Sequence, residues 1–226
     1  MNRELSREEL AGSGNGVVTH NGLLSFAAGL ASQDRADVLN SVLYMQQEAD
    51  LRVDMRVDLE RWFRYYIGGL LDIGWDVDLE FASTPQLAPR LYDSVREAIG
   101  ERIAVVRHDG VRQQTLAAFD ALRYDDAIYS WFKKHVVSAN EASFQISPCI
   151  YAGDRVYMFT LGVGLRITSN FKEFLFPVPS ISGRAIVLDL ASSALRLSKF
   201  RYAEHREAVK SQLGTRALAA VKNYRF

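Results

Sequence analysis

The sequence predicts a single α+β domain in which N-terminal helices pack on a C-terminal antiparallel β-meander that a C-terminal helix closes. Up to about residue 138, apolar residues recur mainly at helical spacing. Residues 142–199 are instead rich in Val, Ile, Phe, Tyr, Thr and Ser, and the turn signals AGD, SN and SISG divide them into short runs. No repeat or linker cuts the chain of 226 residues. Because each helix has an apolar face that needs a partner, we expect the helices to cover one face of a curved sheet.

The N-terminal part is predicted to be helical after a flexible arm. Residues 1–22 contain GSGNG and few apolar positions, so the folded domain is expected to cover 23–226. The clearest helical pattern runs from Leu59 to Leu71, with apolar residues at i, i+3, i+4, i+7 and i+8, and Gly74 ends it. A short strand-like run, WDVDLEF, follows. The predicted helices of this part cover about 34–52, 56–73, 89–100 and two short pieces of 120–136 that break around Tyr124 and Asp125.

Four strand-like runs with short links form the predicted meander. Antiparallel neighbours need only tight connections, and each link contains turn-forming residues. A last helix, with basic residues directed mostly away from its inner stripe, is predicted over about 202–223. The strand-like runs cover 142–151, 155–168, 172–179 and 184–199.

The composition is typical of a soluble globular protein. The chain is 48% hydrophobic and 24% charged. No apolar run approaches the roughly 18–20 residues that span a bilayer. The start, MNRELSREELAGSGNG, has no apolar segment of the kind that a secretory signal contains. One cysteine excludes an internal disulfide and fits a reducing compartment. We expect a cytoplasmic protein that leaves its cell, if it does so, without a classical signal peptide.

The charge is unevenly distributed along the chain. Residues 1–154 carry 15 Lys/Arg and 23 Asp/Glu, whereas residues 155–226 carry 12 Lys/Arg and 4 Asp/Glu, so the net charges are −8 and +8. Either the two parts form complementary surfaces of one fold, or the basic third meets an anionic membrane surface. A nucleic acid is not expected as a partner, because no nucleic-acid-binding motif accompanies the basic residues.

Two patterns that resemble ligand sites are assigned to structure. Asp50, Asp54 and Asp58 are spaced by four, but the arginines between them favour a solvated face over a cation site. With the histidines far apart and one cysteine, no metal site is expected. Gly162 and Gly164 lie in a strand pattern with no helix after them, so they indicate close packing or strand curvature and not a phosphate loop.

Cys149, the single cysteine, follows a proline within a predicted strand. Alternation places it on the strand face of Gln145 and Ser147, opposite Phe144 and Ile146. Three roles are open for its thiol. It is a buried, inert small hydrophobe, a catalytic nucleophile, or the attachment point of a fatty acyl group.

The catalytic role requires a base beside the thiol and a third group that orients the base. His135 and His205 are the candidate bases, since His20 falls in the predicted arm. No recognisable nucleophile motif surrounds Cys149. This alternative predicts a cysteine-dependent acyltransferase or hydrolase with an acyl-thioester intermediate.

The attachment role requires an accessible thiol and an apolar channel for the chain. Burial of an acyl chain contributes about 0.8 kcal/mol per CH₂ group, so a long chain gains much from a dry channel. Aromatic and aliphatic residues of the second helix and of the meander are the candidate lining. They are Trp62, Phe63, Tyr66, Phe159, Leu161 and Val163.

A resemblance to a known family joins these observations. The lone cysteine after a proline at the entry to a β-meander, the basic closing helix and the block VLNSVLYMQQEAD…LERWFRYYIGGLLDIGW resemble the Erwinia virulence factor family from about residue 34 to the end. The resemblance implies a single domain that carries a fatty acyl chain, palmitate or similar, on the cysteine matching Cys149 and sequesters it inside the fold. It also implies a bacterial protein that acts in infection or persistence in an insect host.

The expected function is therefore that of a lipid-carrying, S-acylated virulence or toxin-associated bacterial protein that acts on an insect or other host. Turnover catalysis is not expected. The expected partners are a fatty acid or lipid and a membrane surface, to which one acyl chain and a basic patch would bind together. The competing readings are the cysteine-dependent enzyme and an interaction protein with an inert thiol.

Overall fold

The computed structural model describes residues 16–27, 29–78, 90–92, 94–106, 109–168, 170–176, 186–214 and 221–224. Its strands are β1 (Gly16–Thr19), β2 (Gly22–Phe26), β3 (Trp75–Val77), β4 (Arg90–Tyr92), β5 (Val137–Ser138), β6 (Glu141–Ala152), β7 (Arg155–Arg166), β8 (Ile186–Leu197) and β9 (Val221–Tyr224). Its helices are α2 (Ser32–Asp50), α3 (Leu59–Asp72), α4 (Val95–Ile103), α5 (Asp109–Ala121), α6 (Asp126–Val136), α7 (Phe171–Leu175) and α8 (Lys199–Leu213).

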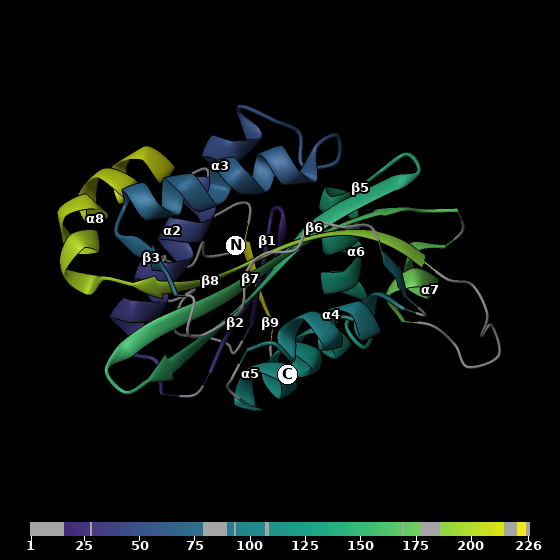
Figure 1. The fold of residues 1–226 in the computed structure, drawn as a ribbon. Coiled ribbons are helices and arrows are strands. Elements are labelled where there is room, and N and C mark those ends of the chain that lie inside the picture. The colour runs from purple at the N-terminus through teal and green to yellow at the C-terminus, as the bar shows by residue number, and fades with distance from the viewer. Residues whose placement is uncertain are drawn as a thin grey trace, which may run out of the picture.

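The strands of the described residues form one sheet in the order β3-β8-β7-β6-β2-β1-β9, with β4 also paired to β8 and β5 to β6. Three long antiparallel strands, β6, β7 and β8, form its centre (Figure 1). The pairing of β2 with β6 is parallel, and it sets Phe26 opposite Cys149. The α+β class and the antiparallel meander of β6, β7 and β8 that the sequence predicts are confirmed.

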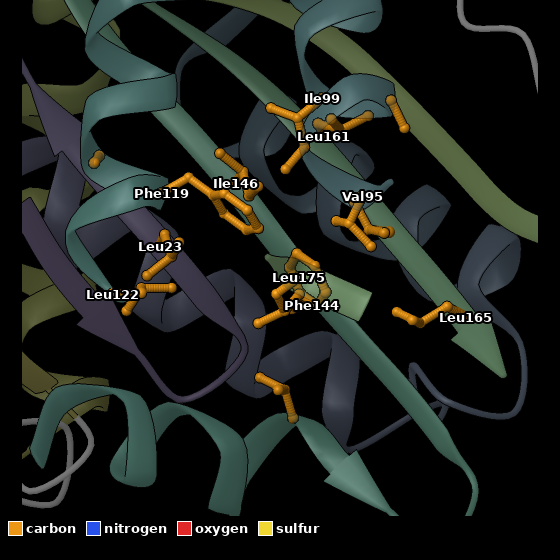
Figure 2. Packing of buried hydrophobic residues seen from close by; sticks show 14 of the residues in the cluster. Leu23, Val95, Ile99, Phe119, Leu122, Phe144, Ile146, Leu161, Leu165 and Leu175 are labelled. Atoms are coloured by element: carbon orange, nitrogen blue, oxygen red, sulfur yellow. The ribbon is translucent and has the colours of Figure 1, made fainter. Parts of the chain in front are cut away.

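Helices cover both faces of the sheet, whereas the sequence predicted cover on one face. In Figure 1, α2, α3 and α8 lie on one side of the sheet, and α4 and α5 lie on the other. Each side has its own cluster of buried apolar residues. Figure 2 shows the cluster beneath α4 and α5, where Phe144 and Ile146 of β6 meet Ile99 and Phe119. The central strands carry apolar side chains at both alternating positions, so both faces require a helical layer.

Residues 16–22, which the sequence analysis placed in a flexible arm, belong to the sheet. They form β1 and the first residue of β2, and every residue of both strands is buried. β1 also pairs with β9, so the end of the chain holds its beginning. Gly22 is required at the contact with β6, because a Cβ there would lie 1.9 Å from the Gln145 carbonyl oxygen. These partners are distant in the sequence, so no local pattern announces them. Residues 1–15 lie outside the described residues.

The amphipathic helices lie where the sequence predicts them. Helices α2 and α3 begin and end within three residues of the predicted ranges 34–52 and 56–73. The predicted break around Tyr124 and Asp125 separates α5 from α6. The Asp125 side chain accepts a hydrogen bond from the Ile128 N–H and so begins α6.

Three predicted elements differ in kind or extent. The first part of the predicted strand 172–179 is helix α7, while residues 177–179 lie outside the described residues. The predicted helix 89–100 begins later, since Arg90–Tyr92 pairs with β8 and Ser94 then caps α4. The predicted helix 202–223 starts at Lys199 and ends at Leu213, and β9 follows because β1 offers it a partner strand. In each case a contact with a distant strand or helix overrides the local pattern.

Ion pairs join the basic helix α8 to acidic residues of the N-terminal part. The Arg206 guanidinium donates two hydrogen bonds to the Asp37 carboxylate, at 2.9 and 2.7 Å, and Asp37 is 1% exposed. Lys199 lies 2.8 Å from Asp34, which is also buried. These pairs support the interpretation that the acidic and basic parts of the chain are complementary surfaces within one fold.

The pair of Arg206 with Asp37 should be the stronger contributor to stability on α8. We expect Arg206→Met to lower the free energy of unfolding by about 3 kcal/mol, because it leaves a buried carboxylate without its cation. Lys210→Met is the matched control on the same helix, since Lys210 pairs with exposed Glu207, and it should cost less than about 1 kcal/mol. Urea denaturation measures both, and equal losses would contradict the assignment.

Candidate functional site

Cys149 lies in the middle of the sheet, between β2 and β7. It is fully buried on the face covered by α2, α3 and α8, with Met158 of β7 opposite it. Its carbonyl oxygen accepts a hydrogen bond from the Ala27 N–H at 2.9 Å. The sulfur makes a weak contact of 3.7 Å with the Ser147 carbonyl oxygen. The backbone therefore holds the thiol at a defined place under the helical layer.

Burial changes the chemistry of this thiol. It raises the pKa of Cys149 well above its ordinary value, because the thiolate would lose its hydration without gaining a compensating charge. A cysteine nucleophile needs the opposite shift, since the thiolate is the reactive form. In the folded state the Cys149 thiol is therefore protonated and unreactive at neutral pH.

A row of buried polar side chains lies on the same sheet face as Cys149. Gln145 and Ser147 precede it on β6, and the Gln145 Nε2 donates to the Ser147 hydroxyl at 2.8 Å. The Ser147 hydroxyl donates to that of Thr160 on β7 at 3.0 Å. The Gln46 Nε2 of α2 donates to the Gln145 Oε1 at 3.0 Å. A hydrogen-bonded polar network thus adjoins the sulfur inside an otherwise apolar layer.

Tyr66 of α3 brings a hydroxyl to this network that has no hydrogen-bond partner in the described residues. The side chain is fully buried. Burial raises the pKa of Tyr66 well above its ordinary value, and Cys149 raises it further. Gln145, Thr160 and Ser147 lie near enough to lower it, yet none meets hydrogen-bond geometry with the hydroxyl. A buried hydroxyl without a partner costs about 1–3 kcal/mol, so this position is incomplete.

Two glycines bring α3 close to the sheet. A Cβ at Gly162 of β7 would lie 3.1 Å from the Leu59 side chain and 3.2 Å from that of Phe63. At Gly164 the nearest atom would again belong to Leu59, at 3.4 Å. The predicted close packing at LGVGL is thereby confirmed. This approach carries Tyr66, one turn along the helix, over the polar row.

The sheet divides the predicted lipid-pocket residues. Trp62, Phe63 and Tyr66 belong to the apolar cluster that contains Cys149, and the rings of Trp62 and Tyr66 stack with centroids 5.2 Å apart. The three residues from the meander belong to the cluster on the opposite face, which Figure 2 shows around Leu161. Odd-numbered residues of β7 point away from the odd-numbered residues of β6, because antiparallel partners share a face and Cys149 pairs with Met158. These three residues are Phe159, Leu161 and Val163.

The candidate bases do not meet the thiol. His135 lies at the end of α6 beside His20, in a cleft that Cys149 does not line. His205 is on α8, and His108 lies outside the described residues. Burial is the cause of the pKa shift of Cys149, with no contribution from an imidazole. The arrangement around the thiol therefore lacks the charge-bearing partner that nucleophilic catalysis requires.

The described residues define the surroundings of the site further. The three cavities that we describe for them, of about 390, 340 and 350 Å³, are not lined by Cys149. They contain no group of three His, Cys, Asp or Glu side chains that could hold a metal ion. Among their helices, none combines the length and the apolar character needed to cross a membrane.

Sequence reasoning missed the polar partners of the site. It placed Gln145 and Ser147 on the face of Cys149 but assigned them no role, and it did not identify Gln46 or Thr160. The detectable signal is a glutamine and a serine on one face of a strand whose other face is apolar. The contact of Gln46 with Gln145 joins residues 99 positions apart, which no local pattern reports.

The Tyr66 hydroxyl allows a stability test in the thiol form of the protein. We expect Tyr66→Phe to raise the free energy of unfolding by about 1 kcal/mol, because it removes an unpaired buried polar group. Thr160→Val should lower it by about 2 kcal/mol, because it removes partners of Gln145 and Ser147. Tyr65→Phe, at the exposed neighbouring position, should change little. A loss for Tyr66→Phe as large as for Thr160→Val would show that the hydroxyl is bonded.

Comparisons with known proteins find one distant likeness to report. No family model matches the chain, and no curated protein sequence matches it. A solved structure described as that of the Evf virulence factor is similar over 93% of this chain and 94% of that chain, with a TM-score of 0.40 and 7% sequence identity. The family named from the sequence is thus met again as a weak structural resemblance to a virulence factor.

Proposed function

We propose that the protein carries a fatty acyl group in thioester linkage on Cys149, held between the sheet and helices α2, α3 and α8. The observation that carries this proposal is the unpaired Tyr66 hydroxyl beside the buried thiol. A thioester carbonyl oxygen on Cys149 supplies the missing acceptor for that hydroxyl. An inert thiol supplies none, and it leaves the cost of the buried hydroxyl without a purpose.

The surroundings of the thiol suit an alkyl chain. The layer between Cys149 and the helices is a continuous apolar cluster that includes Met45, Met55 and Met158. Methionine side chains are unbranched and adapt to changes in shape more readily than branched ones. Each CH₂ group of the chain that enters this layer contributes about 0.8 kcal/mol. Side chains now in contact must move to admit the chain, so loading requires α2 and α3 to separate from the sheet.

Attachment transfers the acyl group from an acyl-thioester donor. The Cys149 sulfur forms a bond to the acyl carbonyl carbon, the bond from that carbon to the donor sulfur breaks, and the Cys149 proton passes to the leaving thiol. This step needs the thiolate, and burial disfavours the thiolate in the closed fold. Loading therefore takes place in the open state of the layer.

The same burial favours a carrier over an enzyme. An acyl-thioester intermediate must be reached by water or a second acceptor in every turnover. A thioester at a fully buried position is shielded from both. The arrangement is therefore suited to holding the acyl group and not to releasing it repeatedly.

The setting of the proposal is bacterial virulence or toxin-associated action on an insect or other host. This part rests on the resemblance of sequence layout described above. The palmitoyl length and the membrane surface as a partner belong to the same proposal. At the membrane, one released acyl chain binds marginally, and basic residues not used in ion pairs with the fold supply a second attraction.

Intact mass spectrometry tests the proposal directly. Protein purified from a bacterial host, or incubated with a long-chain acyl thioester under mild denaturant and then refolded, should carry the added mass of one acyl group. Hydroxylamine, which cleaves thioesters, should remove it, and Cys149→Ser should not acquire it. A bare polypeptide mass after both treatments would refute the carrier. Continuous hydrolysis of the added thioester by the native protein would favour the enzyme.

Tyr66→Phe separates the proposed hydrogen bond from simple burial. In the acylated protein this variant should lose its acyl group to hydroxylamine about fivefold faster, because the net value of one hydrogen bond is about 1 kcal/mol. Tyr65→Phe is the matched control on the same helix and should release the group at the parental rate. Identical rates for all three proteins would remove Tyr66 from the site.

A further inference from the structure

A second cleft lies apart from Cys149, where three segments meet. The β1–β2 turn contributes His20 and Asn21, the end of α2 and the loop after it contribute Asp50, Asp54 and Arg56, and the end of α6 contributes Lys134 and His135. Its volume is about 390 Å³. Neither the sequence patterns nor the proposed function assigns a role to it.

Partners within the protein already engage both carboxylates of the cleft. Asp50 accepts hydrogen bonds from the Asn21 amide at 2.9 and 2.8 Å and from the Trp62 indole N–H at 2.7 Å. Asp54 accepts two hydrogen bonds from the Arg56 guanidinium, at 2.9 and 2.7 Å. The charge of Asp54 is therefore balanced by Arg56, and the oxygen atoms of Asp50 are occupied by donors.

The groups left without such partners are donors or can become donors. Lys134 is exposed and has no ion pair in the described part of the chain. The rings of His20 and His135 meet edge to face with centroids 4.9 Å apart. The His135 Nδ1 lies 2.7 Å from the Trp131 carbonyl oxygen. Because a carbonyl oxygen only accepts, Nδ1 carries the proton, and Nε2 is the atom left to titrate or to contact a ligand.

We propose that this cleft binds a phosphate group, with Lys134 and the protonated imidazoles of His20 and His135 as its cationic partners. A phosphate dianion accepts several hydrogen bonds at once and relieves the repulsion between two adjacent imidazolium rings. The volume exceeds that of a bare phosphate ion, so a phosphate ester fits as well. The proposal is independent of acylation at Cys149.

The charges around the histidines make this binding dependent on pH. Burial lowers the pKa of His20, the neighbouring His135 lowers it further, and so does Arg56, while Asp50 opposes them. The free protein is therefore reluctant to protonate both rings. An anion that binds the protonated rings raises their pKa, so binding takes up protons and strengthens as the pH falls through the histidine range.

Titration calorimetry with inorganic phosphate and with sulfate tests the site. Sulfate is the sharper probe of pH dependence, because it stays a dianion over the whole range while phosphate itself gains a proton. We expect saturable binding at pH 5.5 that weakens by about tenfold at pH 8 for each proton taken up, since the ordinary histidine pKa is about 6.5. Absence of saturable binding at pH 5.5 would overturn the proposal, as would an affinity for sulfate independent of pH.

Matched variants separate the cleft from general basic attraction. Lys134→Gln and His135→Gln should each weaken binding by about tenfold, which corresponds to the loss of one charged hydrogen bond. Lys133→Gln, on the same helix but outside the cleft, and His205→Gln on α8 should leave binding unchanged. Thermal unfolding verifies that all four variants are folded. Equal effects of Lys133→Gln and Lys134→Gln would refute a specific site.

Competition identifies the source of the phosphate group. Vesicles that contain phosphatidic acid should displace bound phosphate if the natural ligand is a lipid headgroup, whereas phosphatidylcholine vesicles should not. A soluble phosphate monoester that competes while both vesicles fail assigns the cleft to a soluble ligand. Either result supports the site, and failure of all three competitors at pH 5.5 contradicts it.

Discussion

The alternation of side chains along β6 and β7, with both faces of the sheet buried, is the constraint on which the rest of the structure depends. Even-numbered residues of β6, such as Phe144 and Ile146, enter the apolar cluster under α4 and α5. Gln145 and Cys149 face the other helical layer. A shift of one residue in the pairing would exchange the two sets and place Gln145 among side chains that offer it no hydrogen bond. The register thus decides the packing of both layers and the position of the thiol.

The polar row on β6 and β7 is incomplete on its helical side. The side chains from the strands are hydrogen-bonded to one another, whereas the Tyr66 hydroxyl on α3 and the Gln46 Oε1 on α2 have no partner in the described residues. The strands are held by backbone pairing on both sides and cannot adjust, while helices pack through side chains that can. The unmet hydrogen bonds therefore lie in the layer that would have to open for an acyl chain.

Charge acts in two ways in this molecule. On α8 it joins distant parts of the chain, because Arg206 and Lys199 neutralise carboxylates that α2 would otherwise bury alone. In the cleft near His135, the internal pairs occupy Asp50 and Asp54 and leave cationic groups over. The net charge of zero therefore does not describe the local field, which the folded arrangement of a chain with an acidic and a basic part determines.

The sequence by itself determined the properties that depend on near neighbours: the single α+β class, the amphipathic helices α2 and α3, the break before α6 and the two faces of β6. Periodicity expresses each of these within a few residues. Only the tertiary structure decided that β1 and β9 join the sheet, that helices cover both faces, and that Leu161 and its neighbours lie opposite Cys149. It also brought Gln46 to Gln145 and His20 to His135. These arrangements depend on pairing and layer order between distant segments, and local side-chain patterns do not specify which distant partner a buried face will meet.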